Sequence, residues 1–218
     1  MSEDSKVITG ILAFTALIVI GMFLFTSNTA SNSVEEVAST PPADTTLLIR
    51  EDSQKIEASD DRITIVEFAD LECEACKIAH PILKQILDEY EGQVNFVFRN
   101  FPFHNNSVLA AKSAEAAGEQ GKFWEMHDLL FENQMEWGEK TTPQTELFIS
   151  YAEELGLDIE AFTAVINSTK YEDKILRDQA DGKALGVNST PTIFFNGQKL
   201  DGIPSVEELE ALIEAELK

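Results

Sequence analysis

The sequence predicts an α/β domain in which a strand–helix–strand unit is followed by a block of helices, a β-hairpin and a final helix. Two β-branched apolar segments, Ile63–Phe68 and Val94–Phe98, flank a stretch whose apolar residues repeat with the helical period. Helical patterning then continues for about 80 residues. The segment Thr190–Phe195 leads into Asn196-Gly197, the strongest short signal for a hairpin turn.

The first elements follow from local pattern. Thr46–Arg50 is short and apolar, and we expect it to form a strand at the edge of the sheet. The helix Cys76–Tyr90 carries its apolar residues on one face, and Pro81 inside it should kink it. Gly92 ends this helix, and the short return into Val94–Phe98 implies a right-handed βαβ unit.

The helical block begins with Ser107–Gln120 and continues with Lys122–Asn133. We expect a third helix at Pro143–Leu155, with Thr142 as its N-cap and proline at its first position. The remaining helices show clear end signals. They are Ile159–Asn167 capped by Asp158, Tyr171–Leu185 stopped by Gly186, and a terminal helix opened by the capping box Ser205-Val206-Glu207-Glu208.

The N-terminus has the character of a membrane anchor. Residues 7–25 contain no charged side chain, and a helix of that length spans roughly 28 Å, close to the hydrocarbon core of a bilayer. A cleaved signal peptide is the alternative, although the leader at residues 1–6 is not basic. We expect that leader in the cytoplasm, a flexible linker at 26–44, and a domain at 45–218 on the extracytoplasmic side of a cell membrane.

The chain is strongly acidic. It has 16 lysines and arginines against 39 aspartates and glutamates, for a net charge of −23. Such a surface repels nucleic acid and anionic lipid headgroups, so neither is an expected partner. Solubility, or adaptation to a salty medium, explains this charge more simply than a specific cationic partner does.

The chain contains two cysteines, Cys73 and Cys76, too few for a disulfide framework or a Cys₄ zinc site. At a helix N-terminus the first would be stabilised as a thiolate and the second could resolve a mixed disulfide. Two alternatives stay open. One is a structural disulfide. The other is a metal-binding or metallochaperone domain using Cys73, Cys76 and His80, with His104 or His127 as a fourth ligand; otherwise we expect the three histidines to be structural or exposed.

Four stretches resemble the DsbA-like thioredoxin superfamily, especially its membrane-tethered bacterial members. In chain order they are Glu67–Cys76, Arg99–Pro102 with His104, Ala114–Ala117 through to Gly121–His127, and Gly186–Thr192. The resemblance implies a thioredoxin-like fold with an all-helical insertion at about 104–185. It further implies a protein thiol–disulfide oxidoreductase that needs no cofactor.

The resemblance also assigns roles to residues. Cys73 would be the attacking nucleophile, Cys76 the resolving cysteine, and Glu67 a buried acid that assists proton transfer near the resolving thiol. Pro191 would be cis, with the backbone of Thr190 free to pair with an extended substrate. The implied partners are exported proteins with thiols or disulfides and a membrane oxidant. The sequence leaves the direction of exchange open between oxidation, isomerisation and reduction.

The dipeptide between the cysteines is expected to tune the redox potential. Glu74 and Ala75 stand where the family commonly has Pro-His or Pro-Tyr. Asp70 and Glu72 add further negative charge near Cys73, and like charge disfavours a thiolate. We therefore predict a Cys73 pKa of about 7, and a pair less oxidising than a relative with histidine in this position.

Overall fold

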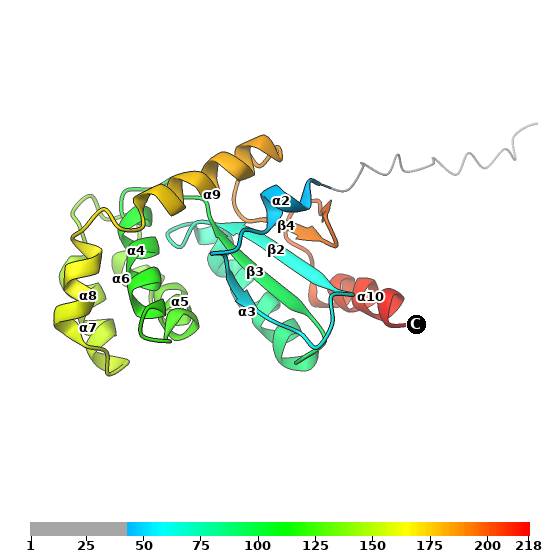
Figure 1. Cartoon of the computed structure of the whole chain (residues 1–218), viewed down its shortest axis with the longest axis horizontal. Helices are drawn as coiled ribbons and strands as arrows, with labels where there is room; N and C mark the ends of the chain where they lie inside the picture. The colour runs from blue at the N-terminus through cyan, green and yellow to red at the C-terminus, as the bar shows by residue number, and fades with distance from the viewer. Residues whose placement is uncertain (1–42) are drawn as a thin grey trace, which may run out of the picture. The chain divides into compact units, whose positions relative to one another are not determined.

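The computed structural model describes residues 43–218, shown as the coloured ribbon in Figure 1. The predicted leader at 1–6, the predicted anchor at 7–25 and nearly all of the predicted linker at 26–44 lie outside the described residues. Within residues 43–218, no helix combines the length and the apolar character needed to cross a membrane.

The fold is built on a five-stranded mixed sheet with the strand order β1-β3-β2-β4-β5. β2 (Thr64–Ala69) and β3 (Asn95–Asn100) run parallel, and α3 (Glu74–Glu89) makes the crossover between them. The other three strands are antiparallel to their neighbours: β1 (Gln54–Ile56), β4 (Thr192–Phe195) and β5 (Gln198–Lys199). The predicted βαβ unit is confirmed.

The prediction of a strand at Thr46–Arg50 is wrong, because this segment contains the short helix α2 (Thr45–Leu48). The carboxylate of Asp44 accepts a hydrogen bond of 2.9 Å from the backbone N–H of Thr46, which satisfies a donor at the first turn of the helix. Leu48 is buried against the sheet. The edge strand is β1 instead, which the sequence pattern did not predict.

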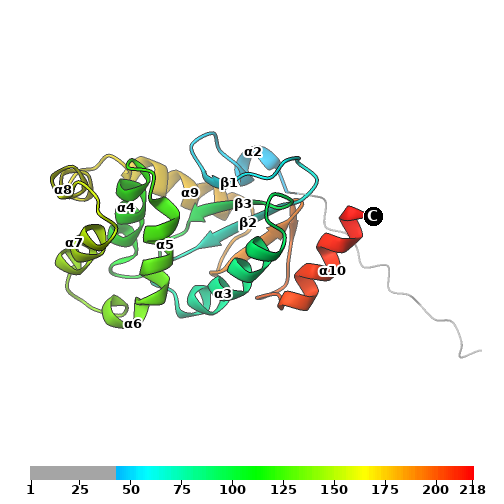
Figure 2. The same ribbon diagram turned by 90° about the horizontal axis from the view of Figure 1, so that it is seen from below.

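Side chains alternate across the sheet and divide the core into two layers. One face packs against α3 and the C-terminal helix α10 (Val206–Leu217); its buried residues include Ile65, Phe96, Phe98, Ile193 and Phe195. The other face packs against α2 and α9 (Glu172–Ala184); its buried residues include Val66, Phe68, Val97, Phe101 and Phe194. Figure 2 shows α3 and α10 on one side of the strands and α2 and α9 on the other.

The predicted helical insertion is confirmed, and Figure 1 shows it beside the sheet. It consists of α4 (Ser107–Gly118), α5 (Phe123–Glu132), α6 (Gln134–Trp137), α7 (Thr145–Glu154) and α8 (Ile159–Ile166). The predicted range of about 104–185 also contained α9, but α9 contacts β3 and α2 and so belongs to the sheet layer.

The starts of α3 and α7 differ from the prediction by two residues, and α3 begins at Glu74 instead of Cys76. α7 begins at Thr145, and Thr142 and Pro143 stay outside it. The buried side chain of Asn106 explains this, because its Oδ1 accepts the backbone N–H of Gln144 at 3.1 Å and its Nδ2 donates to the carbonyl of Lys140 at 2.9 Å. These bonds hold the preceding segment as a loop.

The other end signals are confirmed. Asp158 accepts from the backbone N–H of Ala161 at the start of α8, and Ser205 forms the complete capping box of α10. The hairpin between β4 and β5 turns at Asn196 and Gly197, whose φ angles of 46° and 79° suit a type I′ turn.

Candidate active site

The two cysteines occupy the first turn of α3. Cys73 is the N-cap residue and is half-buried, whereas Cys76 is fully buried; both are free thiols. The segment before the helix is fixed by Gln134 of α6, whose side-chain amide donates to the carbonyl of Leu71 at 2.7 Å and to that of Cys73 at 3.1 Å. The helical insertion therefore helps to position the first cysteine.

The two thiols have opposite acidities. The pKa of Cys73 is lowered from 9.0 to about 5, chiefly by a hydrogen bond from the Cys76 thiol. Burial opposes this shift, while Thr190 and the backbone N–H groups of Cys76 and Ala75 reinforce it. The pKa of Cys76 is raised well above 9.0 by burial, by its hydrogen bond to Cys73, and by the charge of Glu67. One helical turn thus holds a stabilised thiolate and a thiol that keeps its proton.

The predicted Cys73 pKa of about 7 is therefore wrong. Two of the acids behind that prediction are buried and accept hydrogen bonds from backbone N–H groups. Asp70 accepts from the N–H groups of Glu72 at 2.9 Å and Phe103 at 2.7 Å, and Glu72 accepts from Asn106 at 2.6 Å and Glu139 at 3.0 Å. The third acid, Glu74, is exposed. The helix N-terminus and the paired thiol outweigh these charges.

A histidine that the sequence analysis treated as structural or exposed also lies near this site. The Nδ1 atom of His104 is 2.6 Å from Asp70 Oδ2, and its side chain is 46% exposed. Burial alone would lower the pKa of His104, but the hydrogen bond to Asp70 and the negative charges of Asp70, Cys73 and Glu72 raise it. His104 is thus a potential cation beside the Cys73 thiolate.

Glu67 lies on β2, buried beneath the cysteine pair. Its side chain is 2% exposed, and within the described part of the chain its Oε1 atom has no hydrogen-bond partner. Burial, followed by the negative charge of Cys73, raises the pKa of Glu67 from 4.5 to about 8. Glu67 is therefore protonated at neutral pH, with a proton it can give up. Its burial agrees with the sequence analysis, and its role stays a prediction.

The loop before β4 closes the site from the other side. The Thr190–Pro191 peptide bond is cis, as the resemblance implied. The carbonyl of Thr190 lies 3.5 Å from Cys73 Sγ, which can donate to it only while the thiol keeps its proton. Pro191 is buried, while Thr190 stays partly accessible beside the sulfur. Their part in substrate binding stays a prediction.

The alternative metal set of Cys73, Cys76 and His80 is not assembled. Among residues 43–218, the side chains close enough together to hold an ion are His80, His127 and Asp128, and neither cysteine belongs to that group. His80 faces the cavity under α3, whereas Cys73 faces Thr190.

Comparisons with known proteins agree with this geometry. A family model described as thioredoxin matches residues 57–215. The oxidised BdbD of Bacillus subtilis superposes with a TM-score of 0.68 and 24% identity, covering 81% of this chain and 96% of that one. The α-DsbA1 of Wolbachia pipientis superposes with a TM-score of 0.71 and 22% identity, covering 78% and 94%. At these identities the superpositions show a shared fold.

The curated relatives that match this chain are named as Na⁺/H⁺ antiporters. A Na⁺/H⁺ antiporter NhaA 3 of Salinispora tropica is 36% identical over 154 residues, which cover 69% of this chain and 22% of that protein. An NhaA antiporter of Herminiimonas arsenicoxydans is 34% identical over 156 residues, which cover 72% and 24%. The chain thus matches less than a quarter of the length of these two relatives.

Proposed function

The chain belongs to the thioredoxin family whose model it matches, and on that premise we propose that it is a DsbA-like thiol–disulfide oxidoreductase acting on exported proteins. One observation carries the proposal. A thiol with a pKa of about 5 stands one helical turn from a buried thiol whose pKa is raised. Exchange requires this asymmetry, because one sulfur must leave as a thiolate while the other keeps its proton.

The proposed direction is oxidation of the substrate. A substrate thiolate attacks Cys73 Sγ of the Cys73–Cys76 disulfide, the sulfur–sulfur bond breaks, and Cys76 departs with the electron pair. A second substrate thiolate then attacks the substrate sulfur of the mixed disulfide. Cys73 departs as a thiolate, and the substrate carries the new disulfide. The low pKa of Cys73 makes it a good leaving group in this second step.

Glu67 would supply the proton that Cys76 needs on departure. It is protonated below its pKa of about 8, it is buried, and it lies close enough to Cys76 that its ionised form raises the pKa of that thiol. A buried thiolate is costly, so a proton donor beside Cys76 lowers the barrier to its departure. After two electrons have entered the cysteine pair, a membrane oxidant would return it to the disulfide.

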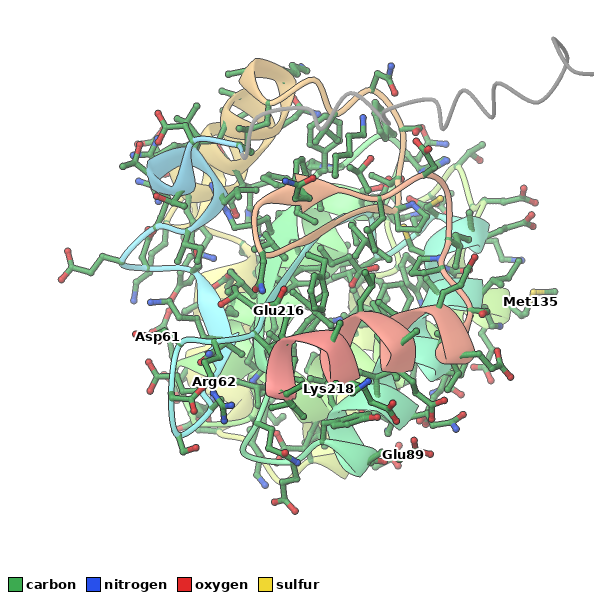
Figure 3. The ribbon with its side chains drawn as sticks, turned by 90° about the vertical axis from the view of Figure 1, so that its right-hand side faces the viewer. Asp61, Arg62, Glu89, Met135, Glu216 and Lys218 are labelled. Carbon is green, nitrogen blue, oxygen red and sulfur yellow. The ribbon has the colours of Figure 1, made fainter. Side chains whose placement is uncertain are left out.

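The surface around the site suits a polypeptide substrate. Large apolar side chains are exposed on segments tied to the active-site loop: Ile78 at 62%, Phe103 at 52%, Val108 at 41% and Met135 at 77%. Met135 points away from the ribbon in Figure 3, and its neighbour Gln134 is bonded to the carbonyl of Cys73. Exposed apolar side chains of this kind contact the apolar segments of incompletely folded chains. The backbone of Thr190 would pair with the extended segment beside the substrate sulfur.

We place this activity at a membrane, on the extracytoplasmic side. The uncharged segment 7–25 supports an anchor. The relatives named as antiporters also associate this domain with a membrane protein. Antiport itself is not part of the proposal, because the match covers only 22–24% of those two relatives. Protease added to spheroplasts should cleave within residues 26–44 and release the domain; protection until lysis would contradict this topology.

Substitution of each cysteine tests the exchange chemistry. Cys73→Ser should abolish oxidation of a reduced model peptide. Cys76→Ser should accumulate mixed disulfides with exported proteins, because the buried resolving thiol is then missing. The two variants control for each other, since both remove the disulfide. Normal oxidation by Cys73→Ser, or equal trapping through either cysteine, would contradict the assignment.

A further inference from the structure

A second cluster of titratable side chains lies between α3 and α5. His80 belongs to α3, His127 and Asp128 belong to α5, and one potential ligand atom from each lies within 4.8 Å of the others. Asp128 Oδ1 is 3.6 Å from His80 Nε2 and 3.3 Å from His127 Nδ1. A single carboxylate oxygen therefore faces two imidazole rings.

This cluster borders a partly open cavity with unpaired polar atoms. His80, His127, Asp128 and Glu67 all line a cavity of about 140 Å³. His127 is 3% exposed, and in the described residues the Nε2 atoms of both histidines and Oε1 of Glu67 have no hydrogen-bond partner. Buried polar atoms are nearly always paired, so the unpaired His80 Nε2 and Glu67 Oε1, on two residues that line one cavity, indicate a polar or ionic occupant. The nitrogen of His127 that faces Asp128 is Nδ1, not the unpaired Nε2.

The chemistry of the three side chains suits cation binding. Imidazole nitrogens and carboxylate oxygens are ligands that zinc-class cations accept, and one from each of His80, His127 and Asp128 lies within reach of a shared ion.

We propose that this cavity binds a divalent transition-metal cation of the zinc class through His80, His127 and Asp128. Ligands about 2.0–2.2 Å from a tetrahedral zinc ion lie roughly 3.3–3.6 Å from one another, which matches the two separations at Asp128 Oδ1. Three protein ligands leave a fourth position open toward the cavity, where a water molecule hydrogen-bonded to Glu67 Oε1 can complete the shell.

Lys84 is a cation that contacts the cluster. Its Nζ atom is 2.5 Å from Asp128 Oδ2, which leaves Oδ1 for the metal, and its side chain is 45% exposed. A hydrogen bond to the second oxygen orients a ligating carboxylate. Solvent screens the charge of a side chain exposed to this degree.

A metal ion at this site would link α3, which packs on the sheet, to the helical insertion. His80 lies on the helix that follows β2, whereas His127 and Asp128 lie in the helical insertion. A cation that binds these three ligands in the folded state and not in the unfolded chain stabilises the folded state by mass action. Metal binding should therefore raise the midpoint of thermal unfolding.

The test uses the full-length chain in detergent, in a Cys73→Ser/Cys76→Ser background so that thiolates cannot bind the metal. After treatment with a chelator, the protein is titrated with Zn²⁺ in a calorimeter and with Co²⁺ in a spectrophotometer. We expect one equivalent to bind, cobalt bands typical of nitrogen and oxygen ligands, and a rise in the unfolding midpoint. Because this background has no exchange activity, the result is independent of the proposed function.

Two variants and one control locate the site. His80→Gln and Asp128→Asn should each lower the affinity at least tenfold, whereas His104→Gln should keep it, since His104 contacts Asp70 instead. Far-UV circular dichroism establishes that each variant is folded. No binding by the folded background protein would overturn the proposal, as would unchanged affinity in both test variants or an equal loss in His104→Gln.

Discussion

Two buried polar groups lie on opposite faces of the central sheet, and their surroundings differ. Arg99 of β3 is fully buried beside α2 and α9. Its Nε donates to Asp178 at 2.9 Å and its Nη2 to Asp181 at 2.7 Å, while Nη1 donates to the carbonyls of Leu47 at 2.7 Å and Leu48 at 2.6 Å. Each of its three nitrogens has an acceptor.

Glu67 of β2, by contrast, has an unpaired polar atom. It faces the cavity under α3, and among the described residues its Oε1 atom is unpaired. Burial therefore has different consequences at Arg99 and at Glu67. A fully paired charge holds α2 and α9 to the sheet, and an unpaired carboxyl keeps a proton that chemistry can use. Substitution at the two positions should therefore change stability in opposite directions.

The largest effect is expected at Arg99. Arg99→Met leaves Asp178 buried without its cationic partner, while Asp181 keeps its pair with Arg50. Breaking a buried pair in this way costs about 3–5 kcal/mol of unfolding free energy. Urea denaturation at pH 7 measures it. The control is Arg62→Met on the surface loop before β2 (Figure 3), where the pair with Asp60 is exposed and should contribute under about 1 kcal/mol. Equal losses in the two variants would show that the buried network is not structural.

Glu67→Gln should instead raise the stability of the reduced protein. The pKa of Glu67 is raised from 4.5 to about 8, so the unfolded chain releases this proton at a lower pH than the folded chain does. Stability is therefore lost as pH rises from about 4.5 to about 8, on the order of 3 kcal/mol by pH 7. The variant should lack this loss.

Urea denaturation of the reduced protein at pH 4 and pH 7 measures the difference. The advantage of Glu67→Gln should be present at pH 7 and nearly absent at pH 4. Glu74→Gln, at an exposed carboxyl in the same region, is the control and should show no comparable pH dependence. A variant less stable than the wild type at pH 7 would mean that the Glu67 carboxylate is paired in solution.

The same Glu67→Gln variant should exchange disulfides more slowly. Glutamine cannot donate a proton to Cys76, and a positioned acid typically accelerates a step by about 10²-fold or more. Stopped-flow measurement of peptide oxidation between pH 5 and pH 9 gives the rate, and the slowing should be greatest below the Glu67 pKa of about 8. An unchanged rate and pH profile would remove Glu67 from the mechanism.

The smallest effect is expected at His104. Its positive charge near Cys73 favours the thiolate, and at a half-exposed position the contribution is a few tenths of a pKa unit. His104→Ala should raise the Cys73 pKa by that amount, whereas His104→Lys, which retains a cation, should raise it less. Thiolate absorbance measures both. A fall in the pKa after His104→Ala would contradict this electrostatic role.

The sequence predicted those parts of the fold that depend on neighbouring residues. The strands around α3, the Asn196-Gly197 turn and the Ser205 capping box all follow from short patterns, and all are present. The segment Thr46–Arg50 was misassigned because its apolar residues also suit a helix that packs on the sheet. The cap from Asp44 favours that helix.

The electrostatics of the site depended on long-range contacts and were predicted less well. Asp70 and Glu72 are close to Cys73 in sequence, but their carboxylates bond to segments more than 30 residues away, near Phe103, Asn106 and Glu139. The same topology brings His127 beside His80 and His104 beside Asp70. The spacing of residues in the sequence does not predict these long-range contacts. The pKa of Cys73 was therefore predicted wrongly, even though the sequence had singled out Cys73 itself.

A pH titration of thiolate absorbance on the reduced wild-type chain tests the central claim most directly. The structure predicts that one thiolate forms with a midpoint of about 5, and that the second does not form until well above pH 9. Cys76→Ala should retain the first transition, at a higher midpoint because the hydrogen bond from the second thiol is lost. Two thiols titrating together at about 8–9, as ordinary cysteines do, would contradict the asymmetry on which the proposed exchange depends.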